Sequence, residues 1–171
     1  MLQGLVLFYV GAVLILNGLW MLGKIDDLEI AAINLFTGGL SLLVALKLAF
    51  GLDADAASIK AAALSLLFSF TYLWVAFNRY NGADGRGLGW FSLFVSITAV
   101  PVAIDMLRHA DSVWQVWLGL SWLSWALLWL LFFLLLAMRK ELTRVTAYLA
   151  IVEGIATGWI PGYLLLTGSI M

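Results

Sequence analysis

The sequence predicts an all-α integral membrane protein built as a bundle of six transmembrane helices. Of its 171 residues, 64% are apolar and 11% are charged, whereas soluble chains average about 45–50% apolar and about 25% charged residues. The mean hydropathy is +1.06. A soluble domain of this size buries only about 70% of its unfolded surface, which would leave a continuous apolar exterior in water. The solvent that fits this composition is a lipid bilayer.

Six apolar windows account for almost the whole chain, and each can cross roughly 30 Å of hydrocarbon as a helix of about 20 residues. The expected spans are, in chain order, Gly4–Leu22, Ile30–Phe50, Lys60–Tyr80, Leu88–Leu107, Val113–Met138 and Thr146–Thr167. The first five end at polar or turn-forming segments, which are Gly23–Glu29, Gly51–Asp55, Asn81–Gly87, Arg108–Ser112 and Arg139–Arg144.

These short connections leave no room for an extramembrane domain, so we expect residues 1–171 to form a single six-helix domain. The first window follows no basic region and precedes no small-residue cleavage site. We therefore expect it to be a mature membrane span and not a signal peptide.

The distribution of Lys and Arg predicts the orientation of the bundle. The odd-numbered connections carry six basic residues, which are Lys24, Arg79, Arg86, Arg139, Lys140 and Arg144. The even-numbered side carries three, which are Lys47, Lys60 and Arg108. Because short cytoplasmic loops are enriched in Lys and Arg, we expect the odd connections in the cytoplasm and both termini outside.

Charge and composition exclude several classes of function. Nine Lys and Arg against ten Asp and Glu give a net charge of −1, so no nucleic-acid partner is expected. The chain has no cysteine and one histidine, which excludes disulfides, thiolate-bound metals and a cysteine nucleophile, and we expect no cofactor. An enzyme would need convergent acid, base or metal-binding groups, which a single deep acid does not supply.

That single acid is Glu153, seven residues into the sixth span. A carboxyl group at membrane depth costs a few kcal/mol even on lenient insertion scales, so it normally faces a bundle interior or water. It is either a hydrogen-bonded helix-packing residue or a hydrogen-bond acceptor in a pore. The usual functional role of intramembrane acids favours the pore.

Aromatic residues form stripes on two of the helices. Trp122, Trp125 and Trp129 are spaced i, i+3, i+7 and share one face of the fifth helix. They occupy mid-span, where interfacial aromatic belts give no account of them, and the alternative is ordinary helix packing. On the third helix one face combines hydroxyls with rings (Ser65, Phe68, Tyr72 and Val75), and rings alone occupy the opposite face (Phe70, Trp74 and Phe77).

Small and amide-bearing residues indicate close helix contacts. Asn17 and Asn34 either tie the first two helices together or line a cavity, and the tie is the favoured interpretation. Gly154 and Gly158 form a small-xxx-small motif, which is typical of helices in close approach.

Several segments carry a family resemblance over all six spans. They are Gly4–Gly11, Asn17-Gly18, Asn34–Ser41, Phe70–Trp74 with Asn78, Gly89–Val95 with Pro101, Leu149–Ile155 and Trp159–Pro161. Together they resemble the AmiS/UreI family of bacterial urea and short-chain amide channels.

The resemblance implies the architecture, partners and site. Each six-helix protomer would hold its own pore, and protomers would form a homo-hexamer with lipid at its centre in the bacterial inner membrane. Urea or short-chain amides would be the permeants, and a soluble amidase or urease would be the functional companion. The pore residues implied are Val10, Leu14, Phe68, Tyr72, Trp122, Trp125, Trp129 and Glu153.

Two departures from the family pattern bear on specificity. Leu118 stands where the family has a tryptophan, and the long histidine-bearing outer loops of acid-gated members are absent, leaving His109. Short loops and an undivided aromatic core resemble the amide branch of the family.

The expected function is therefore a passive channel for small neutral planar amides. One deep acid gives no relay for ion coupling, which favours passive flux. The alternatives are a secondary carrier for the same amides and a membrane subunit that transports nothing.

Overall fold

The computed structural model describes residues 1–170 and contains six helical spans long and apolar enough to cross a membrane. Four spans are single helices, α1 (Leu2–Met21), α2 (Asp27–Phe50), α3 (Ala56–Asn81) and α4 (Arg86–Arg108). The fifth joins α5 (Val113–Phe132) to the π-helical segment η1 (Phe133–Ala137), and the sixth joins α6 (Thr143–Glu153), the π-helical segment η2 (Gly154–Trp159) and α7 (Ile160–Leu166). The predicted spans are confirmed, with bounds that shift by a few residues.

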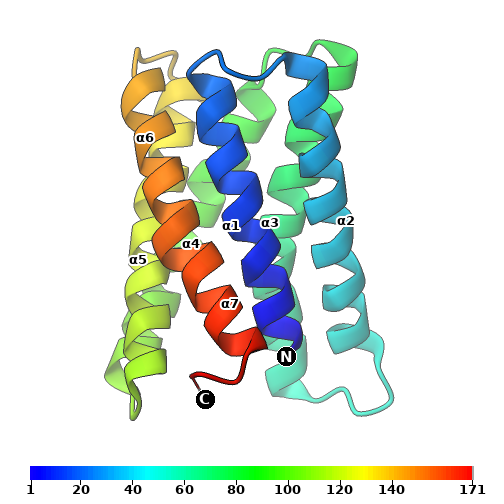
Figure 1. Cartoon of the computed structure of the whole chain (residues 1–171), viewed down its shortest axis with the longest axis vertical. Helices are drawn as coiled ribbons and strands as arrows, with labels where there is room; N and C mark the ends of the chain where they lie inside the picture. The colour runs from blue at the N-terminus through cyan, green and yellow to red at the C-terminus, as the bar shows by residue number, and fades with distance from the viewer. Residues whose placement is uncertain (171) are drawn as a thin grey trace.

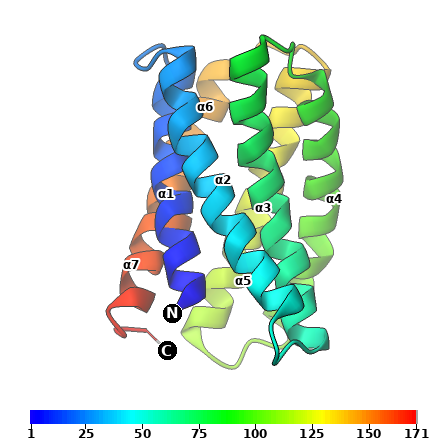
Figure 2. The ribbon, with the colours of Figure 1, turned by 90° about the vertical axis from the view of Figure 1, so that its right-hand side faces the viewer.

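The spans associate as three antiparallel pairs. α2 packs along α3, α4 packs along α5 and η1, and α1 packs against the sixth span, while contacts between the pairs are sparser. Hydroxyls tie two of the pairs, because Ser69 donates to the carbonyl of Gly38 at 2.9 Å and Ser96 donates to that of Ala126 at 2.8 Å. Figures 1 and 2 show the pairs enclosing an elongated interior, with both termini at one end of the bundle.

Local hydrogen bonds define the ends of α3. The Asp55 carboxylate accepts from the backbone N–H of Ser58 at 2.7 Å, and the Ser58 hydroxyl accepts from the backbone N–H of Asp55 at 2.8 Å. These bonds, led by the Ser58 backbone N–H, hold the pKa of Asp55 below its usual value. The helix ends at Gly82, whose φ of 69° lies in the left-handed region that favours glycine.

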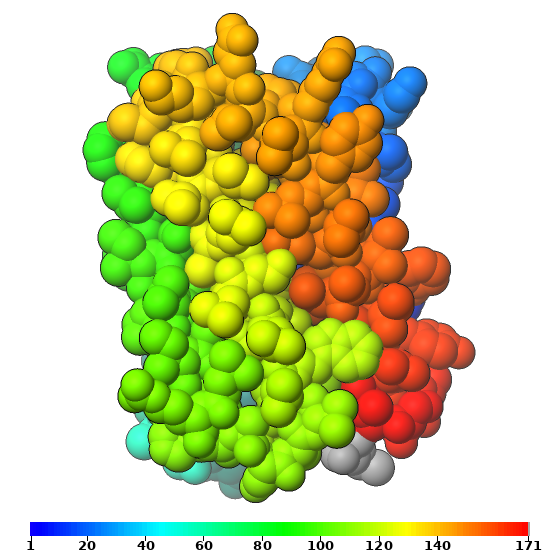
Figure 3. All heavy atoms as spheres, turned by 90° about the vertical axis from the view of Figure 1, so that its left-hand side faces the viewer, coloured from blue at the N-terminus to red at the C-terminus, as the bar shows by residue number. Residues whose placement is uncertain are grey.

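Many large apolar side chains are exposed on the outside of the bundle, and many polar side chains are buried inside it. The face of α3 that carries rings alone points outward, since Phe70, Trp74 and Phe77 are all exposed. Figure 3 shows the side of the molecule that α4, α5 and the sixth span form. Polar side chains buried within the bundle include Asn17, Asn34, Ser69, Ser92, Thr146 and Glu153. This inversion is what a bilayer environment requires, because lipid offers no hydrogen bonds.

The backbones of α1 and the sixth span lie in direct contact at glycines. An added Cβ at Gly154 would stand 2.8 Å from the carbonyl oxygen of Gly11, and one at Gly158 would stand 2.5 Å from both N and Cα of Gly11. The small-xxx-small interpretation of Gly154 and Gly158 is therefore confirmed, and its partner is a glycine on the first helix.

Pro161 has no N–H, so one carbonyl earlier in the sixth span lacks a backbone donor. The π-helical segment η2 determines which carbonyl that is. Ile160 donates to the carbonyl five residues back, at Ile155, so in the same register Pro161 would bond Ala156 but has no N–H to give. The indole of Trp117 donates to that Ala156 carbonyl at 3.0 Å. A side chain from α5 thus satisfies the group that Pro161 leaves open.

We expect Gly158→Ala to destabilise the protein by about 1–3 kcal/mol, because overpacking against a fixed backbone costs that much. Gly39→Ala is the matched control, since an added Cβ there meets no atom within 4 Å. Thermal unfolding of both purified variants in detergent gives the comparison. Equal melting temperatures for the two variants would contradict the close contact.

Candidate functional site

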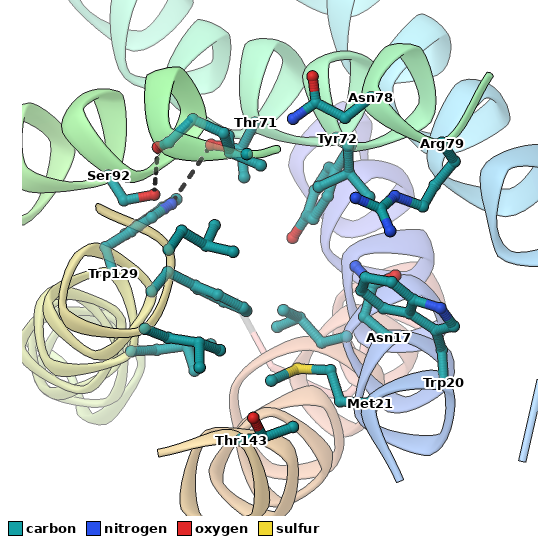
Figure 4. A pocket seen from close by; sticks show the side chains of 18 of the residues that line it. Asn17, Trp20, Met21, Thr71, Tyr72, Asn78, Arg79, Ser92, Trp129 and Thr143 are labelled. Atoms are coloured by element: carbon teal, nitrogen blue, oxygen red, sulfur yellow. Dashed lines mark hydrogen bonds between the residues drawn. The ribbon is translucent and has the colours of Figure 1, made fainter. Parts of the chain in front are cut away.

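Two cavities lie end to end inside the bundle. The larger, about 420 Å³, extends toward the odd-numbered connections, where Trp20, Arg79 and Arg139 line it (Figure 4). The smaller, about 300 Å³, extends toward the termini, where Gln3 lines it together with Leu48 and Met106. Phe68 and Trp125 line both cavities, so the boundary between them lies at these two rings.

The boundary is an aromatic cluster built around Phe68. Its ring packs edge-on against three indoles, with centroid separations of 4.9 Å to Trp125, 4.8 Å to Trp129 and 5.7 Å to Trp122. Trp122 and Trp125 also pack edge-on at 5.3 Å. All four side chains are buried. We call these four residues the aromatic barrier, because rings in mutual contact separate the two cavities.

The structure brings seven of the eight residues expected at a pore to the cavity walls. Val10 and Trp122 line the smaller cavity, Leu14, Tyr72 and Trp129 line the larger, and Phe68 and Trp125 line both. The tryptophan stripe therefore faces the interior of the bundle and not the lipid. Its role in permeation stays a prediction.

Threonines fix the indoles at their edges. Trp125 donates from Nε1 to the hydroxyl of Thr157 at 2.8 Å. Trp129 donates to the hydroxyl of Thr71 at 3.3 Å (Figure 4). Each threonine donates in turn to the carbonyl four residues earlier, Thr157 to that of Glu153 and Thr71 to that of Leu67. The sequence does not indicate these two contacts, because a threonine on a helix face gives no sign of its partner on another helix.

Glu153 is buried but lines neither cavity. Its Oε1 accepts a hydrogen bond from the hydroxyl of Ser124 at 2.6 Å. Its Oε2 is buried and has no hydrogen-bond partner within residues 1–170. One carboxylate oxygen thus takes part in helix packing, while the other has no hydrogen-bond partner in that part of the chain. Ser124, which bonds Glu153, directly precedes Trp125 of the aromatic barrier in the chain. The role of Glu153 as a pore acceptor stays a prediction.

Asn17 and Asn34 form a reciprocal amide pair. Asn34 donates to the Asn17 carbonyl oxygen at 2.7 Å, and Asn17 donates back at 3.1 Å. Asn34 also donates to the carbonyl of Ile30 at 2.9 Å. The predicted tie between the first two helices is confirmed, and Asn17 lines the larger cavity as well.

Two ion-pair groups stand at the end of the larger cavity. In the first, Asp27 accepts from Trp20 Nε1 at 2.6 Å and from Arg79 Nη1 at 3.3 Å, and the Arg79 guanidinium lies 5.1 Å from the centroid of the Trp20 ring. In the second, Asp84 pairs with Arg86 at 2.6 Å and Arg139 at 3.2 Å. The backbone N–H of Arg86, followed by these side chains, lowers the pKa of Asp84.

The profile of the AmiS/UreI family transporters matches residues 2–169. The chain belongs to the AmiS/UreI family. Among AmiS/UreI relatives, a protein of Mycolicibacterium smegmatis named an amidate substrates transporter is 42% identical, over 97% of this chain and 77% of the relative. The acid-activated urea channel of Helicobacter pylori is 38% identical, over 95% of this chain and 96% of the relative.

Solved structures of AmiS/UreI relatives share the fold. The closed-state cryo-EM structure of the Helicobacter pylori urea channel has a TM-score of 0.88 at 38% identity, over 99% of this chain and 100% of that one. A crystal structure of the same channel has a TM-score of 0.85 at 41% identity, over 100% of both chains. These AmiS/UreI neighbours are channels and transporters and not enzymes.

We expect Asn34→Leu to destabilise this AmiS/UreI protein, because it leaves the Asn17 amide without its partner. Hydrogen bonds between membrane helices contribute about 0.6–2 kcal/mol, and the coupling between the two positions should fall in that range. A double-mutant cycle with Asn17→Leu, followed by denaturant unfolding in mixed micelles, measures it. Purely additive losses would contradict the reciprocal pair.

Proposed function

We propose that this protein is a passive channel for small, neutral, planar amides such as urea and acetamide. The observation that carries the proposal is the pair of cavities divided by the aromatic barrier. Membership of a transporter family supports it, as do relatives named a urea channel and an amidate substrates transporter.

The pore walls suit the chemistry of such solutes. An amide that enters hydrocarbon loses its water partners at a cost of several kcal/mol, and a useful pore returns part of that loss. Indole and phenyl faces accept the flat amide plane, and the Tyr72 hydroxyl offers a hydrogen bond from the cavity wall. Glu153 lines neither cavity, and we propose its unpaired Oε2 as a further acceptor. An apolar constriction resists hydrated ions and continuous water, so selectivity comes from shape and hydrogen-bond matching.

The protein belongs, in this proposal, to the amide branch of its family and conducts without acid activation. Its single histidine, His109, has an exposed side chain hydrogen-bonded to the backbone carbonyl of Asp105 at 2.8 Å. The ratio of amide flux at acidic and at neutral external pH should therefore stay near unity. Flux that rises sharply on external acidification would contradict this.

The proposed assembly is a homo-hexamer around central lipid in the bacterial inner membrane, with residues 1–171 as one channel domain per protomer. A soluble amidase or urease would consume the permeant. Exposed apolar side chains around the bundle leave surface for lipid and for neighbouring protomers. Native mass spectrometry of the detergent-extracted protein tests the ring, and a mass of any other oligomer overturns it.

The proposed orientation places the odd connections in the cytoplasm and both termini in the periplasm. The chain has no cysteine, so Lys24→Cys and Asp53→Cys each introduce a single label site on opposite sides. A membrane-impermeant maleimide applied to spheroplasts should label the Asp53→Cys protein alone. Labelling of the Lys24→Cys protein instead would reverse the orientation.

Stopped-flow shrinkage of proteoliposomes tests the function directly. Urea and acetamide should equilibrate faster than in empty liposomes, glycerol should not, and no imposed proton gradient should drive accumulation. Counterflow with saturation would indicate a secondary carrier. Amide flux equal to that of empty liposomes would indicate a subunit that transports nothing.

Substitutions at Glu153 separate the acceptor role from packing. Glu153→Gln keeps an acceptor oxygen and should retain part of the amide flux, whereas Glu153→Leu keeps the bulk without hydrogen bonding and should lose most of it. The same proteoliposome assay measures both variants, with thermal unfolding as the control for folding. Full flux in both would remove the acceptor role.

A further inference from the structure

Asn78 is a buried amide on the wall of the larger cavity that the protein itself leaves unsatisfied. Its side chain is 3% exposed, and it is among the residues that line the cavity. Within residues 1–170 its amide makes no hydrogen bond to another side chain or to the backbone. A buried amide without partners is costly, so its partners must come from the cavity.

Other polar groups on the same cavity wall are already satisfied. Thr71 and Ser92 each donate to the carbonyl four residues earlier on their own helix, at 2.7 and 2.8 Å. Asn17 is paired with Asn34. The open amide of Asn78 differs in this respect from Thr71, Ser92 and Asn17.

A second polar side chain with an unpaired group follows Asn78 in the chain. Asn78 is two turns beyond Thr71 on α3 and so lies on the same side of the helix, toward the connections between spans. Arg79 follows it, lines the same cavity and has a buried Nε without a partner, while its Nη1 contacts Asp27 at 3.3 Å. Figure 4 shows Asn78 and Arg79 on the same stretch of α3, past Tyr72.

We propose that Asn78 forms a binding station for permeating amides on the side of the aromatic barrier that faces the odd-numbered connections, with Arg79 as a further donor on the same cavity wall. This inference rests on the proposed amide channel. An amide side chain donates and accepts at once, so it can pair with urea or a carboxamide as Asn17 pairs with Asn34. The Nδ2 of Asn78 donates to the carbonyl oxygen of the permeant, and its Oδ1 accepts from the permeant N–H.

The station acts on the step at which the solute leaves or approaches the barrier. Between the rings the amide has few hydrogen-bond partners, and Asn78 returns two of them before the solute reaches bulk water. A water molecule or an alcohol donates and accepts through a single oxygen atom, so it cannot form the two-point pair that an amide forms through its neighbouring N–H and C=O groups. The station therefore favours amide flux over water flux, which distinguishes it from a merely structural residue.

Asn78→Ala tests the proposal, because it removes both hydrogen-bonding groups while widening the cavity. In proteoliposomes, urea and acetamide flux should fall about fivefold, the change expected from one net hydrogen bond, while water flux does not fall. Phe77→Ala is the control, since Phe77 precedes Asn78 on α3, has an exposed side chain and lines neither cavity. It should retain the amide flux of the parent protein.

Three outcomes would overturn the proposal. They are unchanged amide flux in Asn78→Ala, an equal loss of water and amide flux, and an equal loss of amide flux in Phe77→Ala. If Asn78→Ala does not fold by thermal unfolding and gel filtration, Asn78→Ser decides, with an intermediate amide flux expected and parental flux contradicting it. A parent protein without amide flux would refute the channel itself, a result distinct from failure of the station.

Discussion

Edge-on packing of the Phe68 ring against three indoles closes the bundle at mid-span, and the rest of the interior is arranged around that contact. The rings come from α3 and α5, which belong to different helix pairs. Edge-to-face aromatic pairs contribute about 0.5–1.5 kcal/mol each beyond the area that they bury. The cluster therefore joins two pairs that otherwise touch sparsely, and it also defines where each cavity ends.

The position of the indoles depends in turn on the sixth span and on its contact with α1. Glycines let the two backbones meet, and Thr157, which holds the edge of Trp125, lies between Gly154 and Gly158. The π-helical turn covers the same residues and exposes the Ala156 carbonyl to Trp117. One short segment thus serves helix packing and orients two aromatic side chains of α5. Such dual use is consistent with the frequent location of π-bulges at functional sites.

Apolar windows of membrane length predicted the six spans, helical periodicity placed the three tryptophans of α5 on one face, and amides within two neighbouring spans indicated the tie. None of these patterns placed Glu153, whose carboxylate bonds to Ser124 and lies off the cavity walls. The periodicity of one helix does not reveal this bond, because Ser124 lies on a different span. Asn78 is among the residues that carry the family resemblance. That its side-chain amide has no hydrogen-bond partner among the described residues becomes clear only from the positions of the surrounding side chains.

The two cavities differ in volume, about 420 Å³ against about 300 Å³, and in the charge at their outer ends. Such asymmetry cannot make a passive conduit into a one-way valve, because at equal concentrations the forward and reverse crossings must balance. The asymmetry instead changes how long a solute stays in each cavity, and therefore how often each cavity is occupied. Net direction is then set by metabolism outside the protein, by whichever compartment removes the solute faster.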